Sequence, residues 1–210
     1  MKIAMPGRSH LIRLSGGLLL LAMAAAAQMP QFGPQDYSAV MVIHLKGGAT
    51  QRMAVAKRGM MWRSKLAIPG HSGGMIQLIN LTTRTMYMIM PQMCMKHALP
   101  NLPPGGALAQ AQEHHPKVAD LGPATVTTGD GKTYACEHSR VTYNIQGKIH
   151  TIEVYAAKDL KNFPVKLTMQ QNGHKVTVTY EDIKLTPPAA SLFAPPAHCG
   201  GMPGMPGFPH

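Results

Sequence analysis

The sequence predicts an α+β protein that consists mainly of one strongly curved antiparallel β-sheet. Short runs of alternating apolar and polar residues recur along the chain, and turn residues such as Gly, Asn and Asp separate them at strand-sized intervals. Only one segment interrupts these runs with helix-forming residues, so strands and helices do not alternate as they do in βαβ units. Aromatic residues make up 5% of the chain, which indicates an interior filled by Met, Val, Ile and Leu.

The N-terminus has the composition of a secretory signal peptide, which we place at residues 1–27. Lys2, Arg8 and Arg13 precede the apolar stretch GGLLLLAMAAAA, which contains several Ala-x-Ala triplets. This apolar stretch is shorter than the roughly 18 residues that a transmembrane span requires. We therefore expect export to the periplasm as a soluble protein, with a flexible leader at residues 28–35 after cleavage.

Length and charge set limits on the mature chain. Removal of the signal peptide leaves 183 residues, enough for one domain with its own core and too few for two. We expect that domain at residues 36–197, followed by a Gly/Pro/Met tail at residues 198–210. Seventeen basic and nine acidic residues remain, a net charge of +8. This charge favours an anionic membrane surface as a partner, although a solvated basic surface is the more common meaning. Scattered basic residues and few aromatics argue against nucleic acid, and we expect a monomer.

The first part of the predicted sheet contains three strands. In the run DYSAVMVIHL, alternation places Met41 and Ile43 on one face, and a Gly-Gly pair ends the strand. Two further runs follow, the second of which carries Trp62. The expected strands are residues 37–45, 50–56 and 60–66.

A hairpin with a methionine face follows. Residues 75–81 are apolar and β-branched, a Thr-Thr-Arg break comes next, and residues 85–90 alternate. Since side chains on a strand point alternately to opposite faces, Met86, Met88 and Met90 project together.

The segment from residue 96 to 122 interrupts the strand pattern. It is rich in proline and glycine, and residues 107–115 favour a helix between Gly106 and Pro116. Long insertions in compact domains are usually functional or disordered. We interpret residues 96–122 as a loop with one short helix that forms a lid.

The second part of the chain reads as an antiparallel meander. Turn sequences GDGK, QGK and NGH separate its strands. The apolar alternation of the last strand changes parity after Glu181-Asp182, which predicts a β-bulge there. The expected strands are residues 124–128, 134–145, 149–156, 163–170 and 175–180.

The order of these segments resembles exported bacterial domains of the lipoprotein-carrier superfamily that LolA and LolB typify. The most specific part runs from Asp159 to Pro196: a strand with Pro164-Val165, an NG hairpin and the sequence EDIKLTPPAASLFAPP. The resemblance covers about residues 36–197 and points to a methionine-rich branch. It implies an unclosed β-barrel, or half-barrel, whose concave side is covered by a lid and encloses an apolar cavity for lipoprotein acyl chains or other lipids.

A hydrophobic ligand is therefore the first functional hypothesis, in a carrier-like or sensor-like role. Methionine is flexible and polarizable, so a wall of methionines adapts to chains of varying shape. The alternative is that the same side chains simply fill a core. The candidate cavity residues are Met41, Ile43, Trp62, Met86, Met88, Met90, Val165 and Leu167.

Copper binding is the second hypothesis, and otherwise no cofactor is expected. Thioether and thiol ligands select Cu(I), and the candidate ligands are Met93, Cys94, Met95 and His97. The C-terminal segment adds His198, Cys199, Met202, Met205 and His210. Export also permits one disulfide, and Cys94, Cys136 and Cys199 allow three pairings.

An enzyme is the least supported interpretation, and we predict none. Glu181 and Asp182 are adjacent on a strand and so point to opposite faces, unlike a working acid/base pair. Cys136 and His138 share a face, but a disulfide or a core cysteine explains Cys136 better than a catalytic dyad. The sequence contains no zinc or nucleotide motif.

Overall fold

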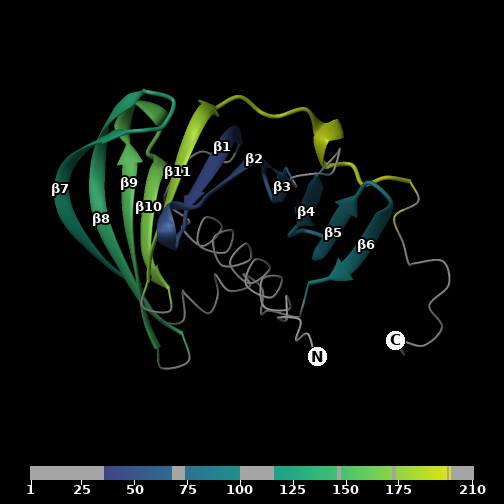
Figure 1. Ribbon diagram of the computed structural model, residues 1–210, viewed down its shortest axis with the longest axis horizontal. Coiled ribbons are helices and arrows are strands. Elements are labelled where there is room, and N and C mark those ends of the chain that lie inside the picture. The colour runs from purple at the N-terminus through teal and green to yellow at the C-terminus, as the bar shows by residue number, and fades with distance from the viewer. Residues whose placement is uncertain are drawn as a thin grey trace, which may run out of the picture.

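The computed structural model describes residues 36–67, 74–99, 116–145, 148–171, 174–197 and 199. Within them, eleven strands form one strongly curved sheet (Figure 1) in the order β6-β5-β4-β3-β2-β1-β11-β10-β9-β8-β7. The strands are β1 (Tyr37–His44), β2 (Thr50–Arg58), β3 (Met61–Leu66), β4 (Met75–Asn80), β5 (Thr85–Met90), β6 (Met93–Ala98), β7 (Lys117–Thr127), β8 (Thr133–Ile145), β9 (Lys148–Ala157), β10 (Phe163–Gln171) and β11 (His174–Lys184). Three short 3₁₀ helices accompany them: η1 (Lys46–Gly48), η2 (Lys158–Leu160) and η3 (Ala190–Phe193).

The sheet is built from two meanders that meet at its centre. β1 pairs with β11, and every other neighbouring pair is antiparallel as well. From β1 the sheet grows outward to β6, and from β7 at the opposite edge the chain returns inward to β11. Among the described strands, β6 and β7 are edges that do not pair with each other. The prediction of a mainly antiparallel, unclosed sheet is therefore confirmed.

The predicted insertion at residues 96–122 is wrong at both ends. Residues 96–98 complete β6, and residues 117–122 begin β7. In β7, Gly122 and Pro123 look like turn residues, but the strand is an edge, where a proline removes no ladder hydrogen bond. Gly122 has a φ of 90° and lies at a register shift opposite β8, so its turn-like character produces a bulge instead.

Other predicted segments lie outside the described residues. These are the lid helix at residues 107–115, the signal peptide at residues 1–27, the leader at residues 28–35 and all of the tail except Cys199. What the sequence indicates for these segments therefore remains a prediction.

The bulge predicted at Glu181-Asp182 is confirmed. β1 advances two residues from Ser38 to Val40 while β11 advances three, from Lys184 to Glu181. Asp182 has a φ of 50°, in the left-handed region, which gives the extra residue its kink. As a consequence Tyr180 and Glu181 are both buried, although they are neighbours in one strand.

The core lies on one face of the sheet, which we call the inner face and which carries Phe163 and Tyr180. Phe163 meets the rings of Tyr37 and Tyr180 edge-on, with centroid distances of 4.8 and 5.2 Å. Tyr37 in turn packs edge-on against Trp62 at 5.9 Å. Such aromatic pairs each contribute about 0.5–1.5 kcal/mol beyond their buried area. The aromatic cluster therefore ties β1 and β3 to β10 and β11 across the curve of the sheet.

After β11 the chain runs past the upper ends of β3–β6, as the yellow ribbon in Figure 1 shows, and Phe193 and Pro195 lie against Leu78 and Tyr87 on the opposite, outer face. We call residues 185–197 together with Cys199 the C-terminal strap. Arg58 Nη1 donates to Pro188 O at 3.0 Å, and Phe193 in η3 is buried against the sheet. Cys199 forms a disulfide with Cys94 of β6. This answers the pairing question, and Cys136 is left as a free, buried thiol.

Candidate functional site

β4, β5 and β6 bring a group of methionines together on the inner face. Trp62 belongs to the inner core, and the register pairs it with Ile79, which pairs with Met86. Because faces alternate along each strand, the other residues of that face follow at steps of two. We call this group the methionine face, and its members are Met75, Met86, Met88, Met90, Met93 and Met95.

The methionines of β5 and β6 are direct cross-strand neighbours. Met88 lies opposite Met95 and Met90 lies opposite Met93. In the third pair, Met86 lies opposite His97. Directly opposed residues of an antiparallel pair have Cβ atoms about 4.5–5.5 Å apart. The flexible thioethers of each pair can therefore meet above the sheet.

The methionine face is half-buried, in contrast to the methionines at the centre of the sheet. Met41 and Met53 are 1% and 2% exposed, whereas all six residues of β5 and the first three of β6 have intermediate exposure. The methionine face is therefore within reach of a small molecule or ion, and Met41 and Met53 are core.

The eight predicted cavity residues all lie on the inner face, but they divide into two groups. One group is packed in the core: Met41, Ile43, Trp62, Val165 and Leu167 are each no more than 7% exposed. The other group, Met86, Met88 and Met90, belongs to the half-buried methionine face. That any of them binds a ligand stays a prediction.

A buried amide marks the border between the core and the methionine face. Gln77 of β4 is 5% exposed, and its Nε2 donates to Met86 Sδ at 2.9 Å. Its Oε1 has no hydrogen-bond partner among the described residues. Ser64, which lies opposite Gln77, is also buried. Leaving a buried acceptor unpaired costs about 1–3 kcal/mol. The unpaired Oε1 of Gln77 therefore lowers the stability of this part of the inner face.

The predicted copper ligands do not share one face. Met93, Met95 and His97 lie on the inner face of β6, whereas Cys94 between them points to the outer face and is bonded to Cys199. Residues 93–97 form a strand, and alternation separates the thiol from the thioethers. The proposed ligand set with Cys94 is therefore wrong. His198, Met202, Met205 and His210 lie outside the described residues.

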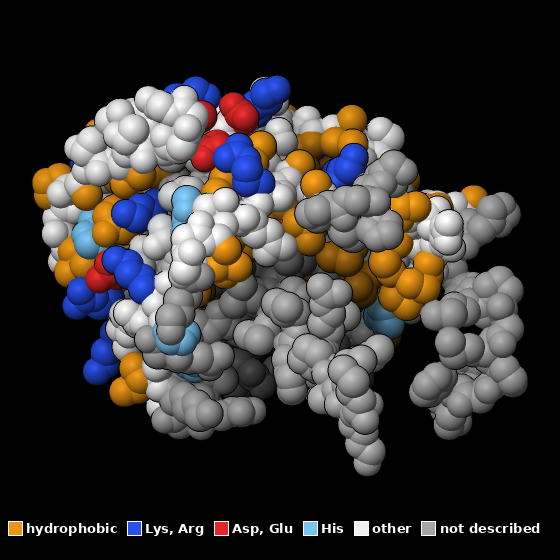
Figure 2. All heavy atoms as spheres, in the orientation of Figure 1, with side chains coloured by type: hydrophobic (Ala, Val, Ile, Leu, Met, Phe, Trp, Pro, Cys, Tyr) orange, Lys and Arg blue, Asp and Glu red, His pale blue; other side chains and the backbone are white. Residues whose placement is uncertain are grey.

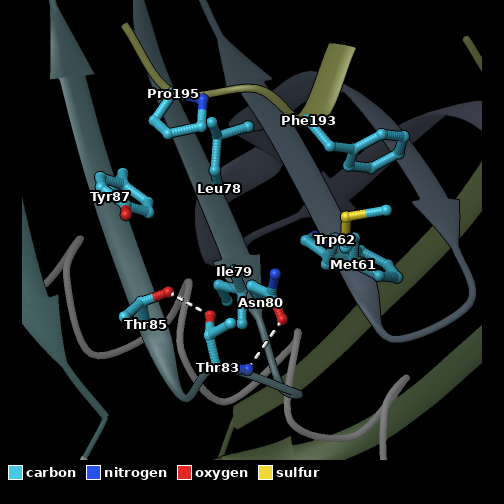
Figure 3. Close-up of a pocket in the computed structure, with 10 residues that line it drawn as sticks. All are labelled: Met61, Trp62, Leu78, Ile79, Asn80, Thr83, Thr85, Tyr87, Phe193 and Pro195. Carbon is cyan, nitrogen blue, oxygen red and sulfur yellow. Dashed lines mark hydrogen bonds between the residues drawn. The ribbon is translucent and has the colours of Figure 1, made fainter. Parts of the chain in front are cut away.

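A small pocket of about 160 Å³ lies between the C-terminal strap and the sheet (Figure 3). Leu78 and Tyr87 form its floor on the outer face, and Phe193 and Pro195 of the strap lie over them. Asn80 at one end has its side-chain oxygen bonded by the backbone N–H groups of two threonines, at 2.9 and 3.0 Å. A cavity of this size holds a group about as large as benzene, which is too small for an acyl chain.

The pocket was missed by the sequence reasoning, which gave the outer face of the hairpin no covering element. Leu78 is 4% exposed on that face, where Phe193 and Pro195 of the strap lie over it. The signal was present in two places. Leu78 and Tyr87 form an apolar pair on the face opposite the methionines, and the segment ASLF supplies Phe193 shortly after the last strand.

The groups considered for catalysis are explained by packing. The thiol of Cys136 donates to Tyr134 O, and burial raises its pKa, which keeps it protonated and unreactive. Glu181 is buried and is paired at 2.6 Å with Arg52. His138 stacks on Tyr155, with ring centroids 4.1 Å apart. None of these contacts forms a nucleophile and base pair.

On the face shown in Figure 2, most Lys and Arg side chains lie away from β3–β6, and hydrophobic side chains are exposed over both halves of the molecule. Met60, Leu81 and Leu192 are exposed by 56%, 43% and 42%, and Leu81 N donates to Met60 O at 3.1 Å. In the part of the chain that the structure describes, no helix has the length and apolar character needed to cross a bilayer.

Comparisons with known proteins show a likeness of fold. No family model and no curated sequence matches the chain. The chain is similar to an uncharacterized conserved protein of Thermus thermophilus, with a TM-score of 0.53 and 12% identity over 86% of this chain and 97% of that one. Other matches are the lipoprotein LppX of Mycobacterium tuberculosis (TM-score 0.43, 10% identity, 80% and 96% covered) and a LolA superfamily protein of Nitrosomonas europaea (0.38, 14%, 85% and 97%). The chain thus shares its fold with the Thermus protein.

Proposed function

We propose that the protein binds a hydrophobic ligand, a lipid or a lipoprotein acyl chain, on the inner face of its unclosed barrel. The observation that carries this proposal is a row of apolar side chains that runs across the sheet. Met41 pairs with Met53, Met53 with Leu66, and Leu66 with Met75. Met90 and Met93 continue the same row at the edge.

Along this row the exposure rises from the centre to the edge. Met41 and Met53 are buried, and Met75, Met90 and Met93 have intermediate exposure. A chain that lies on the half-buried end gains about 0.8 kcal/mol for each methylene that it buries. Flexible methionines adjust to its shape. The edge end of the row is therefore the binding surface, and the central end is the core that supports it.

The resemblance of the sequence to lipoprotein carriers and the apolar signal-like N-terminus support the same function in the periplasm. In this proposal the protein acts as a monomer and is a carrier or a sensor. It holds and releases the chain without any catalysed reaction. The net charge of +8 on the mature chain suits delivery at an anionic membrane surface.

Uptake of a fluorescent fatty acid by the purified protein tests this proposal. Met88→Lys places a charge on the inner face of β5 and should weaken binding by about 10-fold or more, because two buried methylene contacts are worth roughly that factor. Ile89→Lys places the same charge one residue further along, on the outer face, and should leave binding nearly unchanged.

Two results would overturn the proposal. One is the absence of both fatty-acid uptake and co-purifying lipid in native mass spectrometry of protein isolated from the periplasm. The other is equal weakening by Met88→Lys and Ile89→Lys, which would show that the inner face is not the binding surface.

A further inference from the structure

The sulfur atoms of β5 and β6 are confined to one face of the sheet, apart from the disulfide sulfur of Cys94. The inner-face positions of the two strands are Met86, Met88, Met90, Met93, Met95 and His97, and none of their outer-face positions is a methionine. Flexible methionines suit a lipid-binding wall, although the residues that strands ordinarily favour on an apolar face are β-branched. The concentration of thioethers on this face also suits a second kind of ligand.

Four of these thioethers form a compact group. Met88 faces Met95 and Met90 faces Met93 across the β5–β6 ladder, and the two pairs are adjacent on the same face. Cβ atoms of directly opposed residues are about 4.5–5.5 Å apart, and the diagonal neighbours are within reach of long side chains. All four have intermediate exposure, so an ion can approach them.

The donor set determines which ion the group can hold. Residues 74–99 contain no Asp or Glu, so this face offers no carboxylate to Ca²⁺ or Mg²⁺. Neutral, polarizable thioethers select soft ions. We propose that Met88, Met90, Met93 and Met95 form a thioether site for Cu(I). Binding by neutral thioethers displaces no proton, and methionine cannot be lost to disulfide formation outside the cytoplasm.

The contacts of the neighbouring side chains define the limits of this site. The sulfur of Met86 already accepts a hydrogen bond from Gln77 at 2.9 Å, which holds it away from the group. Cys94 lies on the outer face in its disulfide with Cys199, so no thiol takes part. The inference goes beyond lipid binding and does not depend on it, although both use the methionine face.

Anaerobic titration of the full-length mature protein with Cu(I), in competition with a chromophoric Cu(I) chelator, tests the site. One Cu(I) per chain is expected. The variant Met93→Leu/Met95→Leu removes two of the four ligands and should lower the affinity by at least about 10-fold. Loss of a residue that only orients a ligand already costs a metal site about that much. Met60→Leu is the matched control, because Met60 is 56% exposed in the β2–β3 turn and should have no effect.

A second measurement keeps the proposal falsifiable if the double variant fails to fold. In wild-type protein with ¹³C-labelled methionine methyl groups, Ag(I) serves as a redox-inert probe of the same softness. Shifts of the Met88, Met90, Met93 and Met95 methyl signals support the site. Unshifted signals from these four, or shifts confined to Met202 and Met205, overturn it, as does wild-type affinity in a folded double variant. Neither the Cu(I) titration nor the Ag(I) experiment uses lipid. A negative result for metal binding is therefore distinct from a negative result for fatty-acid binding.

Discussion

The row of apolar side chains from Met41 to Met93 differs in packing between its two ends, although methionines occupy both. At the centre, Met41 and Met53 are buried beside the aromatic cluster around Phe163. At the edge, Met90 and Met93 are half-buried, and the last three residues of β6 are exposed. The central strands have neighbours on both sides in the sheet, and β6 at the edge has one. Stability is therefore concentrated at the centre, and the methionines that a ligand could reach are concentrated at the edge.

The largest difference between the two regions should appear when each loses a large side chain contact. Phe163→Ala removes a 1% exposed ring that packs against Tyr37 and Tyr180. It should lower the free energy of unfolding by about 3–5 kcal/mol. Met88→Ala at the half-buried edge should cost less than about 2 kcal/mol, the lower limit for truncation of a buried methionine. Urea unfolding of both variants measures the two costs.

Equal costs would contradict the comparison, because they would show that the edge is packed as tightly as the centre. Tyr180 adds a check on the centre. Burial raises the pKa of its hydroxyl, and that hydroxyl has no hydrogen-bond partner among the described residues. Tyr180→Phe should therefore be nearly neutral, since it removes an unpaired polar atom from the core.

The disulfide holds the C-terminal strap against the edge region, so its removal should affect that region most. Cys94 and Cys199 are 105 residues apart in sequence. Replacing both with Ser should lower the free energy of unfolding by about 2–4 kcal/mol, because the unfolded chain gains freedom. In hydrogen exchange, amides of β5 and β6 should lose more protection than those of β10 and β11.

Reduction of the wild-type protein provides the control for this variant and should reproduce its loss of stability. Equal loss of protection across all strands would mean that the strap is not a local support of the edge. Cys136→Ala is not a suitable control, because that thiol is 1% exposed and its replacement leaves a cavity.

The same contrast explains which features could be predicted from the sequence. Alternation predicted the faces correctly wherever one face is buried, as for Met41 and Ile43 or for Met86 and Met88. The bulge at Asp182 was visible because apolar parity changes there. These are local consequences of a side-chain period of two.

The features that were missed depend on contacts between distant parts of the chain. The first half of β7 was hidden because Gly122 and Pro123 signal a turn, and only the edge position in the sheet makes them acceptable in a strand. Met93 and Met95 were not grouped with Met88 and Met90 because the sequence predicted no strand at β6. The pocket beneath Phe193 requires the strap, whose path is fixed by a disulfide that spacing alone could not assign.

Acid should weaken the β7–β8 turn and its contact with β11 and leave the methionine face unchanged, and this is the smallest of the expected effects. Asp130, in the β7–β8 turn, accepts hydrogen bonds from Thr128 Oγ1 and from the backbone N–H of Asp182 at the bulge of β11. Lys132 Nζ lies 3.1 Å from its carboxylate. Desolvation by burial opposes the charge, but these hydrogen bonds outweigh it and hold the pKa of Asp130 well below its usual range.

Because the folded pKa of Asp130 is depressed, its contribution to stability is present above the ordinary pKa of about 3.9 and is lost as the pH falls toward the folded value. Asp130→Asn should lower the free energy of unfolding by about 1–2 kcal/mol at pH 7, and the gap from wild type should narrow between about pH 4 and pH 2.5. Thermal unfolding across this range measures it. Residues 74–99 contain no carboxylate side chain. Acid should therefore change amide exchange in β5 and β6 equally in the wild type and in Asp130→Asn.

A stability gap between wild type and variant that stays constant with pH would show that the Asp130 charge does not stabilise the turn. Greater loss of protection in β6 than in β11 would show that acid acts on the edge first.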